Sequence, residues 1–178
     1  MFGQYIDCYS YFDADGHSAS SIRGSVEELA NYVKSHGPFD GVVGFSQGAV
    51  LAATLIIAVE KQLLEMEVPF KCAVFLCGGL PFDFAALRDG EVKLLETDWK
   101  KPLIHLPTTN AWASNDIDYP GMGPPLSQMC SAENNQEVVH TAGHGVPAEG
   151  EELARLIEAV RATIKIASYN TTTRKIDG

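Results

Sequence analysis

The feature that most constrains this sequence is the pentapeptide GFSQG at positions 44–48, which joins two apolar stretches. The stretch before it, residues 39–45, predicts a buried strand. Residues 47–65 after it predict a helix whose first half is apolar on every face. A serine at such a junction sits on a sharp strand-to-helix turn, where neighbouring glycines leave room for a strained backbone. The pattern therefore predicts that the Ser46 hydroxyl is lifted clear of a sheet, in front of unpaired N–H groups at the helix N-terminus.

Two other interpretations of this segment are a nucleotide-binding turn and a simple helix cap. Gly41, Gly44 and Gly48 do not have the G-x-G-x-x-G spacing of dinucleotide-binding turns. No Lys-Ser or Lys-Thr pair follows them, as it does in a phosphate-binding P-loop. The plainer alternative is a tight glycine turn in which Ser46 only caps the helix. The pentapeptide alone leaves that alternative open.

Strand and helix patterns alternate along the chain, which predicts one α/β domain over residues 1–178 with a largely parallel sheet. A helix is expected to begin at Ser25, where Glu28 completes a capping box, and to end before Gly37. An amphipathic repeat predicts the last helix over residues 149–165. The other expected segments are an irregular start at 1–21, strands at 71–77, within 103–113 and at 136–141, a surface excursion with some helix at 82–101, a short helix at 126–132 and a polar tail at 168–178.

The composition argues against several classes of function. The chain has 178 residues and a formal charge of −10, and it has no basic run that could bind a nucleic-acid backbone. Every apolar run is shorter than the roughly 18 residues of a membrane-spanning helix, and the first residues lack the pattern of a signal peptide. A cytoplasmic location is therefore the default expectation. The cysteines, which follow no metal-binding spacing, are expected to pack as small hydrophobes; they are Cys8, Cys72, Cys77 and Cys130.

A serine hydroxyl needs a base, and His144 is the histidine best placed to serve. It lies between two glycines in a loop after the fourth expected strand and before the last helix. In hydrolases with the chain order Ser…Asp…His, the base stands at this place and an acid follows an intervening strand. Asp116 and Asp118 both meet that condition. Asp116 comes first after the strand and is preferred. The alternative is that both aspartates are ordinary loop residues that only stabilise a turn.

Four segments together resemble the fungal serine hydrolase family of the α/β-hydrolase fold: residues 37–49, 73–79, 110–116 and 143–147. That family includes small esterases and thioesterases of polyketide biosynthesis, and it is related to the animal ovarian-cancer-associated hydrolases. The resemblance implies hydrolysis of a carboxylic ester or acyl thioester without a metal or organic cofactor. It also implies an acyl carrier protein of a polyketide synthase as a candidate partner. By position, it assigns Ser46 as nucleophile, Asp116 as acid, His144 as base and the Gln47 backbone N–H as an oxyanion donor.

The front of the chain departs from this family. Members begin with a strand that ends in a Leu-His-Gly loop, then a helix and a second strand, and residues 1–23 match none of these. Either the protein or its gene model is therefore expected to be shortened. We expect an α/β-hydrolase-like sheet that lacks the first strand–helix–strand unit and has the strand before Ser46 at its edge.

This departure also lowers the expected activity. The missing loop supplies a second oxyanion donor, and removing one such donor typically costs about 10²–10³ in rate. The chain is therefore expected to be weak, unstable or inactive unless something covers the exposed edge of the sheet. The alternatives are an inactive hydrolase remnant that acts as a partner or has no activity, and an α/β domain that binds a small molecule without turnover.

Overall fold

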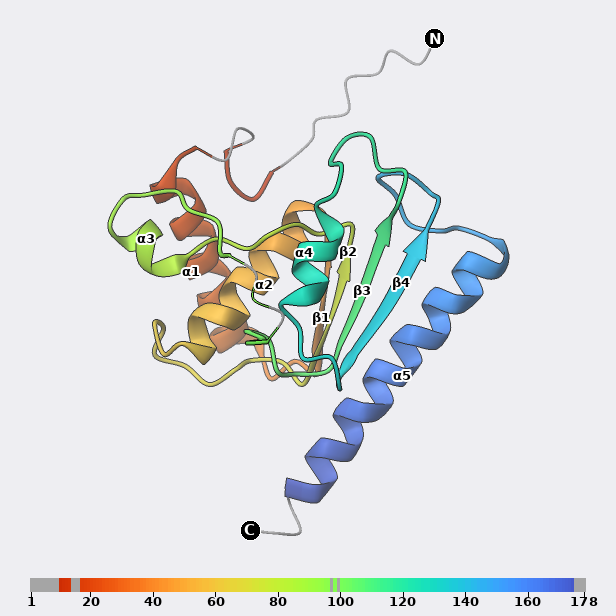
Figure 1. The fold of residues 1–178 in the computed structure, drawn as a ribbon. Coiled ribbons are helices and arrows are strands. Elements are labelled where there is room, and N and C mark those ends of the chain that lie inside the picture. The colour runs from red at the N-terminus through yellow and green to blue at the C-terminus, as the bar shows by residue number, and fades with distance from the viewer. Residues whose placement is uncertain (1–9, 14–16, 97, 99, 175–178) are drawn as a thin grey trace.

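The computed structural model describes residues 10–13, 17–96, 98 and 100–174, and Figure 1 shows them as a parallel sheet flanked by helices. The strands pair in parallel, in the order β1-β2-β3-β4. Their bounds are Gly41–Phe45 for β1, Cys72–Leu76 for β2, Thr108–Ala113 for β3 and Asn135–His140 for β4. The predicted α/β class with a largely parallel sheet is confirmed, and a strand lies in each of the four predicted places.

Parallel pairing brings the carboxyl ends of all four strands to one edge of the sheet. In register, Phe45 of β1 lies opposite Leu76 of β2, and Ala113 of β3 lies opposite His140 of β4. The chain segments that leave these strands therefore start side by side. Three of them carry the residues singled out above, so this edge is where a functional site can form.

Five helices connect and cover the strands of the described chain: α1 Ala19–His36, α2 Gln47–Glu60, α3 Phe84–Arg88, α4 Gly123–Gln128 and α5 Gly150–Arg174. α2 and α4 lie on the same face, since a Cβ added to Gly78 would meet both Ala49 of α2 and Leu126 of α4. α1 and α3 pack against each other and against α2. α5 packs on β2, β3 and β4 and crosses the sheet beside β4 (Figure 1).

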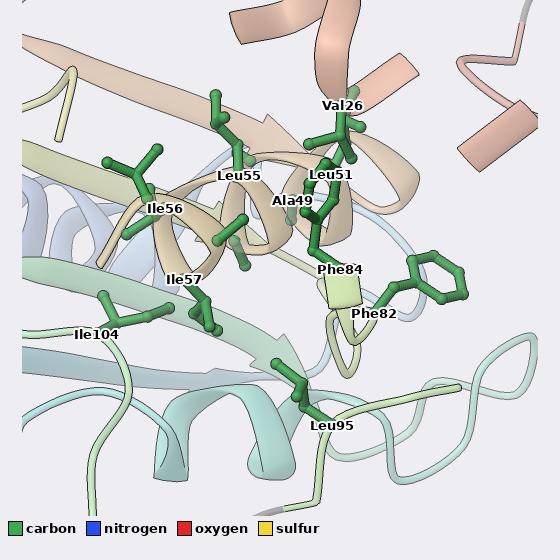
Figure 2. Packing of buried hydrophobic residues seen from close by; sticks show 14 of the residues in the cluster. Val26, Ala49, Leu51, Leu55, Ile56, Ile57, Phe82, Phe84, Leu95 and Ile104 are labelled. Carbon is green, nitrogen blue, oxygen red and sulfur yellow. The ribbon is translucent and has the colours of Figure 1, made fainter. Parts of the chain in front are cut away.

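The two faces of the sheet carry unequal cores. The larger cluster centres on α2, and Figure 2 shows its side chains converging around that helix. Every residue from Leu51 to Val59 is buried, as the apolar sequence of this helix predicts. A smaller cluster lies under α5 and includes Leu156. Because Phe75 packs in the first cluster and its neighbour Leu76 in the second, β2 is covered on both faces.

β1 differs from β2 in its exposure. It is an edge strand of the described sheet, and Val43 and Phe45 are 70% and 45% exposed. Val43 and Phe45 share one face of the strand, and α5 packs on the neighbouring strands β2 to β4. The predicted edge position is therefore confirmed, whereas the prediction of a buried strand at 39–45 is wrong.

α1 begins earlier than the capping box predicts. Ser18 is its N-cap, and the Ser18 side chain accepts a hydrogen bond from the N–H of Ser21. Ser25 lies inside the helix and donates its hydroxyl back to the Ser21 carbonyl, so it caps nothing. The irregular start predicted for residues 1–21 is therefore wrong over 19–21, and most of the rest of it lies outside the described residues.

Two helices in the middle of the chain have other bounds than predicted. α2 stops at Glu60 instead of residue 65, and two residues later Gln62 adopts a left-handed backbone with φ of 57°. α4 lies earlier than the predicted range 126–132, because its two prolines occupy the first turn, where their missing N–H groups are not needed.

Two predicted surface segments contribute more structure than expected. Within 82–101, the side chains of Phe82, Phe84, Leu87 and Leu95 are buried in the larger cluster, so this segment is not merely a surface excursion. The polar tail predicted at 168–178 is helical as far as Arg174, where α5 ends, and the last residues lie outside the described part of the chain.

Candidate active site

Ser46 stands between β1 and α2 in a strained backbone conformation. Its φ is 51° and its ψ is −118°, and its side chain makes no capping hydrogen bond to α2. A Cβ on Gly44 would come within 2.6 Å of the Ala49 backbone, so the turn requires glycine there. A Cβ on Gly48 would meet only the Tyr11 ring, at 3.4 Å. The expectation that both glycines make room for the turn is thus right for Gly44 and wrong for Gly48.

Two hydrogen bonds join Ser46, His144 and Asp116. Nε2 of His144 lies 2.8 Å from Oγ of Ser46, and Nδ1 of His144 lies 2.7 Å from Oδ2 of Asp116. The side chains of His144 and Asp116 are 14% and 9% exposed. The three residues follow β1, β4 and β3, whose carboxyl ends meet at the same edge. We refer to this hydrogen-bonded arrangement as the triad.

Asp116 is held by three donors, which explains why this aspartate, and not Asp118, faces the imidazole. Its Oδ1 accepts the backbone N–H of Asp118 at 3.0 Å and that of Tyr119 at 2.9 Å. Burial by itself would raise the pKa of Asp116, but the hydrogen bonds from His144 and from these N–H groups lower it overall. The carboxylate therefore stays ionised beside His144 at neutral pH.

The approach to the triad is bordered by apolar side chains. The ring centroids of Tyr119 and Phe45 lie 4.6 Å and 5.4 Å from that of His144, and both side chains are about half exposed. A cavity of about 580 Å³ opens beside Ser46 along β1, with Leu51 among its apolar lining. An apolar group could therefore reach the Ser46 hydroxyl without losing contact with protein.

Gln47 contributes to the turn with its backbone and its side chain. Its N–H, at the start of α2, has no acceptor among the described residues and lies next to Ser46 in the chain. Its Oε1 accepts the N–H of Tyr11 at 2.7 Å, and its Nε2 donates to the carbonyl of Phe12 at 3.4 Å. Sequence reasoning missed this second role, because it joins residues that are far apart in the chain.

The loop that carries His144 is tied to other elements by residues that sequence reasoning did not single out. Glu152 of α5 accepts both the N–H and the hydroxyl of Thr141, each at 3.0 Å. Cys77, after β2, donates its thiol to the carbonyl of Gly145 at 3.2 Å. Burial raises the pKa of the Cys77 thiol, which keeps it protonated for this bond. These ties fix the loop from two sides.

The other histidines do not reach the triad. His140 is buried at the end of β4, where its Nδ1 accepts the N–H of Ala142 at 3.2 Å and burial lowers its pKa. His105 is exposed beside Glu60. His17 lies just before α1 and His36 is its last residue.

Among the described residues, the cysteines and the other acidic groups form no second centre. Cys72, Cys77 and Cys130 are free and buried, as predicted, while Cys8 lies outside the described residues. Over the described ranges, we find no group of three or more His, Cys, Asp or Glu side chains placed to hold a metal ion. The described helices include none that is both long and apolar enough to cross a membrane.

The comparison with protein families assigns the chain to a known group. Residues 3–156 match the model described as Serine hydrolase (FSH1). The chain belongs to the serine hydrolase (FSH1) family. The match includes the strained turn at Ser46 and both other residues of the triad, and it confirms the resemblance inferred from the sequence.

Several proteins similar to this chain are esterases or hydrolases by name. Esterase FPY3 of Fusarium mangiferae is 36% identical over 149 residues, which cover 81% of this chain and 66% of that protein. Hydrolase FUB4 of Gibberella moniliformis is 43% identical over 121 residues, which cover 56% of this chain and 45% of that one. Esterase OVCA2 of Danio rerio is 30% identical over 135 residues, covering 75% and 54%. This chain thus spans about half to two-thirds of the length of these relatives.

Solved structures show the same fold at low sequence identity. A carboxylesterase from Mesorhizobium loti superposes with a TM-score of 0.56 at 16% identity, covering 89% of this chain and 71% of that one. A hydrolase from Agrobacterium vitis gives a TM-score of 0.55 at 16% identity, covering 80% and 68%. The chain therefore has the α/β-hydrolase fold, with four parallel strands in the part described here.

Proposed function

We propose that this FSH1-family chain hydrolyses carboxylic esters or thioesters, with Ser46 as nucleophile, His144 as general base and Asp116 as the acid that orients the base. The observation that carries the proposal is the 2.8 Å contact between Nε2 of His144 and Oγ of Ser46. An ionised Asp116 at Nδ1 favours the imidazole tautomer with its proton on Nδ1, which leaves Nε2 free to accept the serine proton.

In the proposed reaction, Oγ of Ser46 attacks the carbonyl carbon while Nε2 of His144 takes the hydroxyl proton. The carbonyl electron pair moves onto oxygen, and the resulting tetrahedral intermediate collapses as the C–O or C–S bond breaks. His144 returns the proton to the departing alcohol or thiol. Water then attacks the acyl-serine with the same base, which releases the carboxylic acid and restores Ser46.

The developing oxyanion needs donors that are already in place. The N–H of Gln47 is the donor proposed here, because it is unpaired within the described chain and follows Ser46 at the helix N-terminus. One such donor is worth about 10²–10³ in rate.

The surroundings of Ser46 favour an apolar substrate. Tyr119 and Phe45 flank the imidazole, and the cavity beside the serine is lined mainly by apolar side chains such as Val43. We therefore propose that the acyl or alcohol part of the substrate is hydrophobic. In a series of p-nitrophenyl esters, kcat/KM should rise from acetate to medium-length acyl chains. An unchanged or falling series would contradict this part of the proposal.

Ester and thioester substrates, and the carrier-protein partner implied by the family resemblance, can be separated in one assay. The same acyl group is offered as an ethyl ester, as an N-acetylcysteamine thioester and as a thioester on an acyl carrier protein. Faster release from the carrier than from the small thioester would support a carrier partner. Equal rates would remove it from the proposal, and the chain charge of −10 already disfavours an acidic carrier.

A fluorophosphonate probe tests the proposed function directly. The serine oxygen displaces fluoride from phosphorus, so labelling requires an activated hydroxyl and reports on it even when turnover is slow. We expect the wild-type chain to be labelled to one equivalent and Ser46→Ala to remain unlabelled. Ser35→Ala, which removes another hydroxyl at the far end of α1, should label like the wild type. A folded wild type that does not label, or labelling that survives Ser46→Ala, would overturn the proposal.

The exposed edge of β1 favours a second candidate function, an inactive domain that binds a partner. Alternate backbone groups of an edge strand are unpaired, and Val43 adds an exposed apolar side chain beside them. This candidate predicts a folded chain that resists the probe and associates in size-exclusion chromatography. Reduced association in Val43→Lys would support it.

A further inference from the structure

We infer that Asn115 is a positioning residue that keeps the loop carrying His144 aligned with Asp116. The inference rests on the proposed function for its effect on catalysis. Asn115 takes no part in the catalytic steps proposed above. Asn115 directly precedes Asp116 in the chain, and its side chain reaches the other loop of the triad.

The side chain of Asn115 uses both ends of its amide group. Its Nδ2 donates to the carbonyl of Thr141 at 2.9 Å, and its Oδ1 accepts the N–H of Gly143 at 3.2 Å. Both partners are backbone groups in the loop that precedes His144. One short side chain must both donate and accept here, which an amide can do and a carboxylate or an alkyl group cannot.

These two bonds extend the pairing of β3 and β4 beyond the end of the sheet. The backbone register of the two strands ends at Ala113 and His140, and one further backbone bond joins the N–H of Ser114 to the carbonyl of His140. After that point the strands separate into loops. The Asn115 amide supplies the next hydrogen bonds, and these connect the two loops that carry Asp116 and His144.

The loop needs this additional connection because its own backbone can adopt many conformations. Gly143 has a φ of 61° and Gly145 follows His144, so the backbone on both sides of the histidine can turn easily. The ties from Glu152 and Cys77 come from α5 and from the segment after β2. They hold the loop in place but do not connect it to the segment that carries Asp116, which the Asn115 side chain does.

The expected effect is moderate, because Asn115 is exposed and water can replace part of its bonding. In Asn115→Ala we expect acylation to slow about 10-fold, less than the ~10² that a misplacement of about 1 Å can cost. KM should stay within about twofold, since the residue lies in the loops and not in the apolar cavity. Asn115→Asp keeps the acceptor for Gly143 but sets a carboxylate against the Thr141 carbonyl, and it should not restore the wild-type rate.

The matched control is Asn134→Ala. Asn134 is also an asparagine that ties two loops, with Nδ2 donating to the carbonyl of His105 at 3.1 Å, but it lies just before β4 at the opposite edge of the sheet. Its loss should leave acylation unchanged. A thermal melt of each variant reports any general loss of stability.

The experiment measures the rate constant and the final extent of fluorophosphonate labelling at neutral pH, together with the one-dimensional proton NMR signal of Nδ1–H in His144. In Asn115→Ala we expect full but slower labelling. We also expect the NMR signal to be lost, because Nδ1–H exchanges with water when its contact with Asp116 is weakened. A purely structural defect would lower the labelled fraction and leave the signal of the folded molecules in place.

Two results would overturn the inference: labelling of Asn115→Ala at the same rate as Asn134→Ala, or a slower rate that is explained by a smaller labelled fraction. The NMR signal separates the inference from the proposed function. If the wild type never labels, the proposed function fails. The positioning role is then still decided by whether the His144 signal is lost in Asn115→Ala and kept in Asn134→Ala.

Discussion

The two halves of the site are built in different ways. Ser46 is held by its own neighbours in the chain: a strained φ of 51°, a glycine at 44 that leaves room for Ala49, and the start of α2 directly behind it. His144 sits in a glycine-flanked loop and is held by partners from other elements. The tight turn thus carries the proposed nucleophile, and the tied loops carry the proposed base.

This difference predicts how each half fails. A change in the turn disturbs the packing of β1 on α2, so it should cost stability along with activity. A change in the loops removes hydrogen bonds that are mostly near solvent, so it should cost activity with little loss of stability. The first two of the following comparisons test that contrast, each with a pair of similar substitutions.

The largest effect is expected in the loops, at Asp116. Asp116→Asn keeps the size of the side chain but offers His144 an amide, which favours the wrong imidazole tautomer. In a serine protease the equivalent change lowers kcat about 10⁴-fold, and we expect labelling to slow by about 10³–10⁴ here. Stopped-flow or gel-based labelling kinetics measure this.

Asp118→Asn is the matched control for that substitution. Asp118 supports Asp116 through its backbone N–H, which the variant retains. Its labelling rate should stay within about twofold, the size of a neutral surface change. Similar losses in the two variants would show that the charge of the loop matters rather than the contact with His144.

The next effect is expected in the turn, at its two glycines. In Gly44→Ala the new Cβ would lie 2.6 Å from the Ala49 backbone, and backbone cannot move aside as a flexible side chain can. We expect the free energy of unfolding to fall by about 1–3 kcal/mol, with labelling reduced as well. Urea denaturation followed by circular dichroism measures the loss.

Gly48→Ala makes the same chemical change at the other end of the motif. Its Cβ would make an ordinary contact with the Tyr11 ring, and alanine favours the helix by up to about 1 kcal/mol over glycine. Stability should therefore be unchanged or slightly higher. A loss as large as that of Gly44→Ala would mean that the turn depends on both glycines.

The smallest effect is a pH dependence of stability at His140, next to the His144 loop. Burial lowers the pKa of His140; Arg155 adds to this, while the charges of Glu152 and Asp116 oppose it. The unfolded pKa of His140 is roughly 6.5, and between this value and the lower folded pKa the unfolded chain binds more protons than the folded one. The contribution of His140 to the free energy of unfolding is therefore fully present above about pH 6.5 and is lost as the pH falls.

Thermal melts at pH 7.5 and 5.5 measure this contribution. The melting temperature of the wild type should fall more between the two pH values than that of His140→Gln, which cannot titrate. The depressed pKa of Asp116 acts in the same direction but below about pH 3.9, so the two effects are separated in pH. Equal falls in the two proteins would contradict the assignment to His140.

Much of the site could be predicted because each of its three residues lies in the segment that leaves the carboxyl end of a strand. Parallel strands end at one edge, so the order of Ser46, Asp116 and His144 along the chain was enough to expect them together. Asn115 and Tyr119 could not be found in this way, because their partners depend on how two loops turn. The start of α1 differs from the prediction because serines at both 18 and 25 suit a helix cap, and only packing selects between them.

The sequence alone determined the alternation of strands and helices, the strained turn at Ser46 and the residue types that can perform acyl transfer, because each of these is written in a short stretch of chain. The tertiary structure decided which aspartate faces His144, which side chains tie its loop, and that β1 is exposed beside a well-covered β2. Those properties arise from contacts between residues far apart in the chain, whose energies depend on how helices such as α5 cover the sheet.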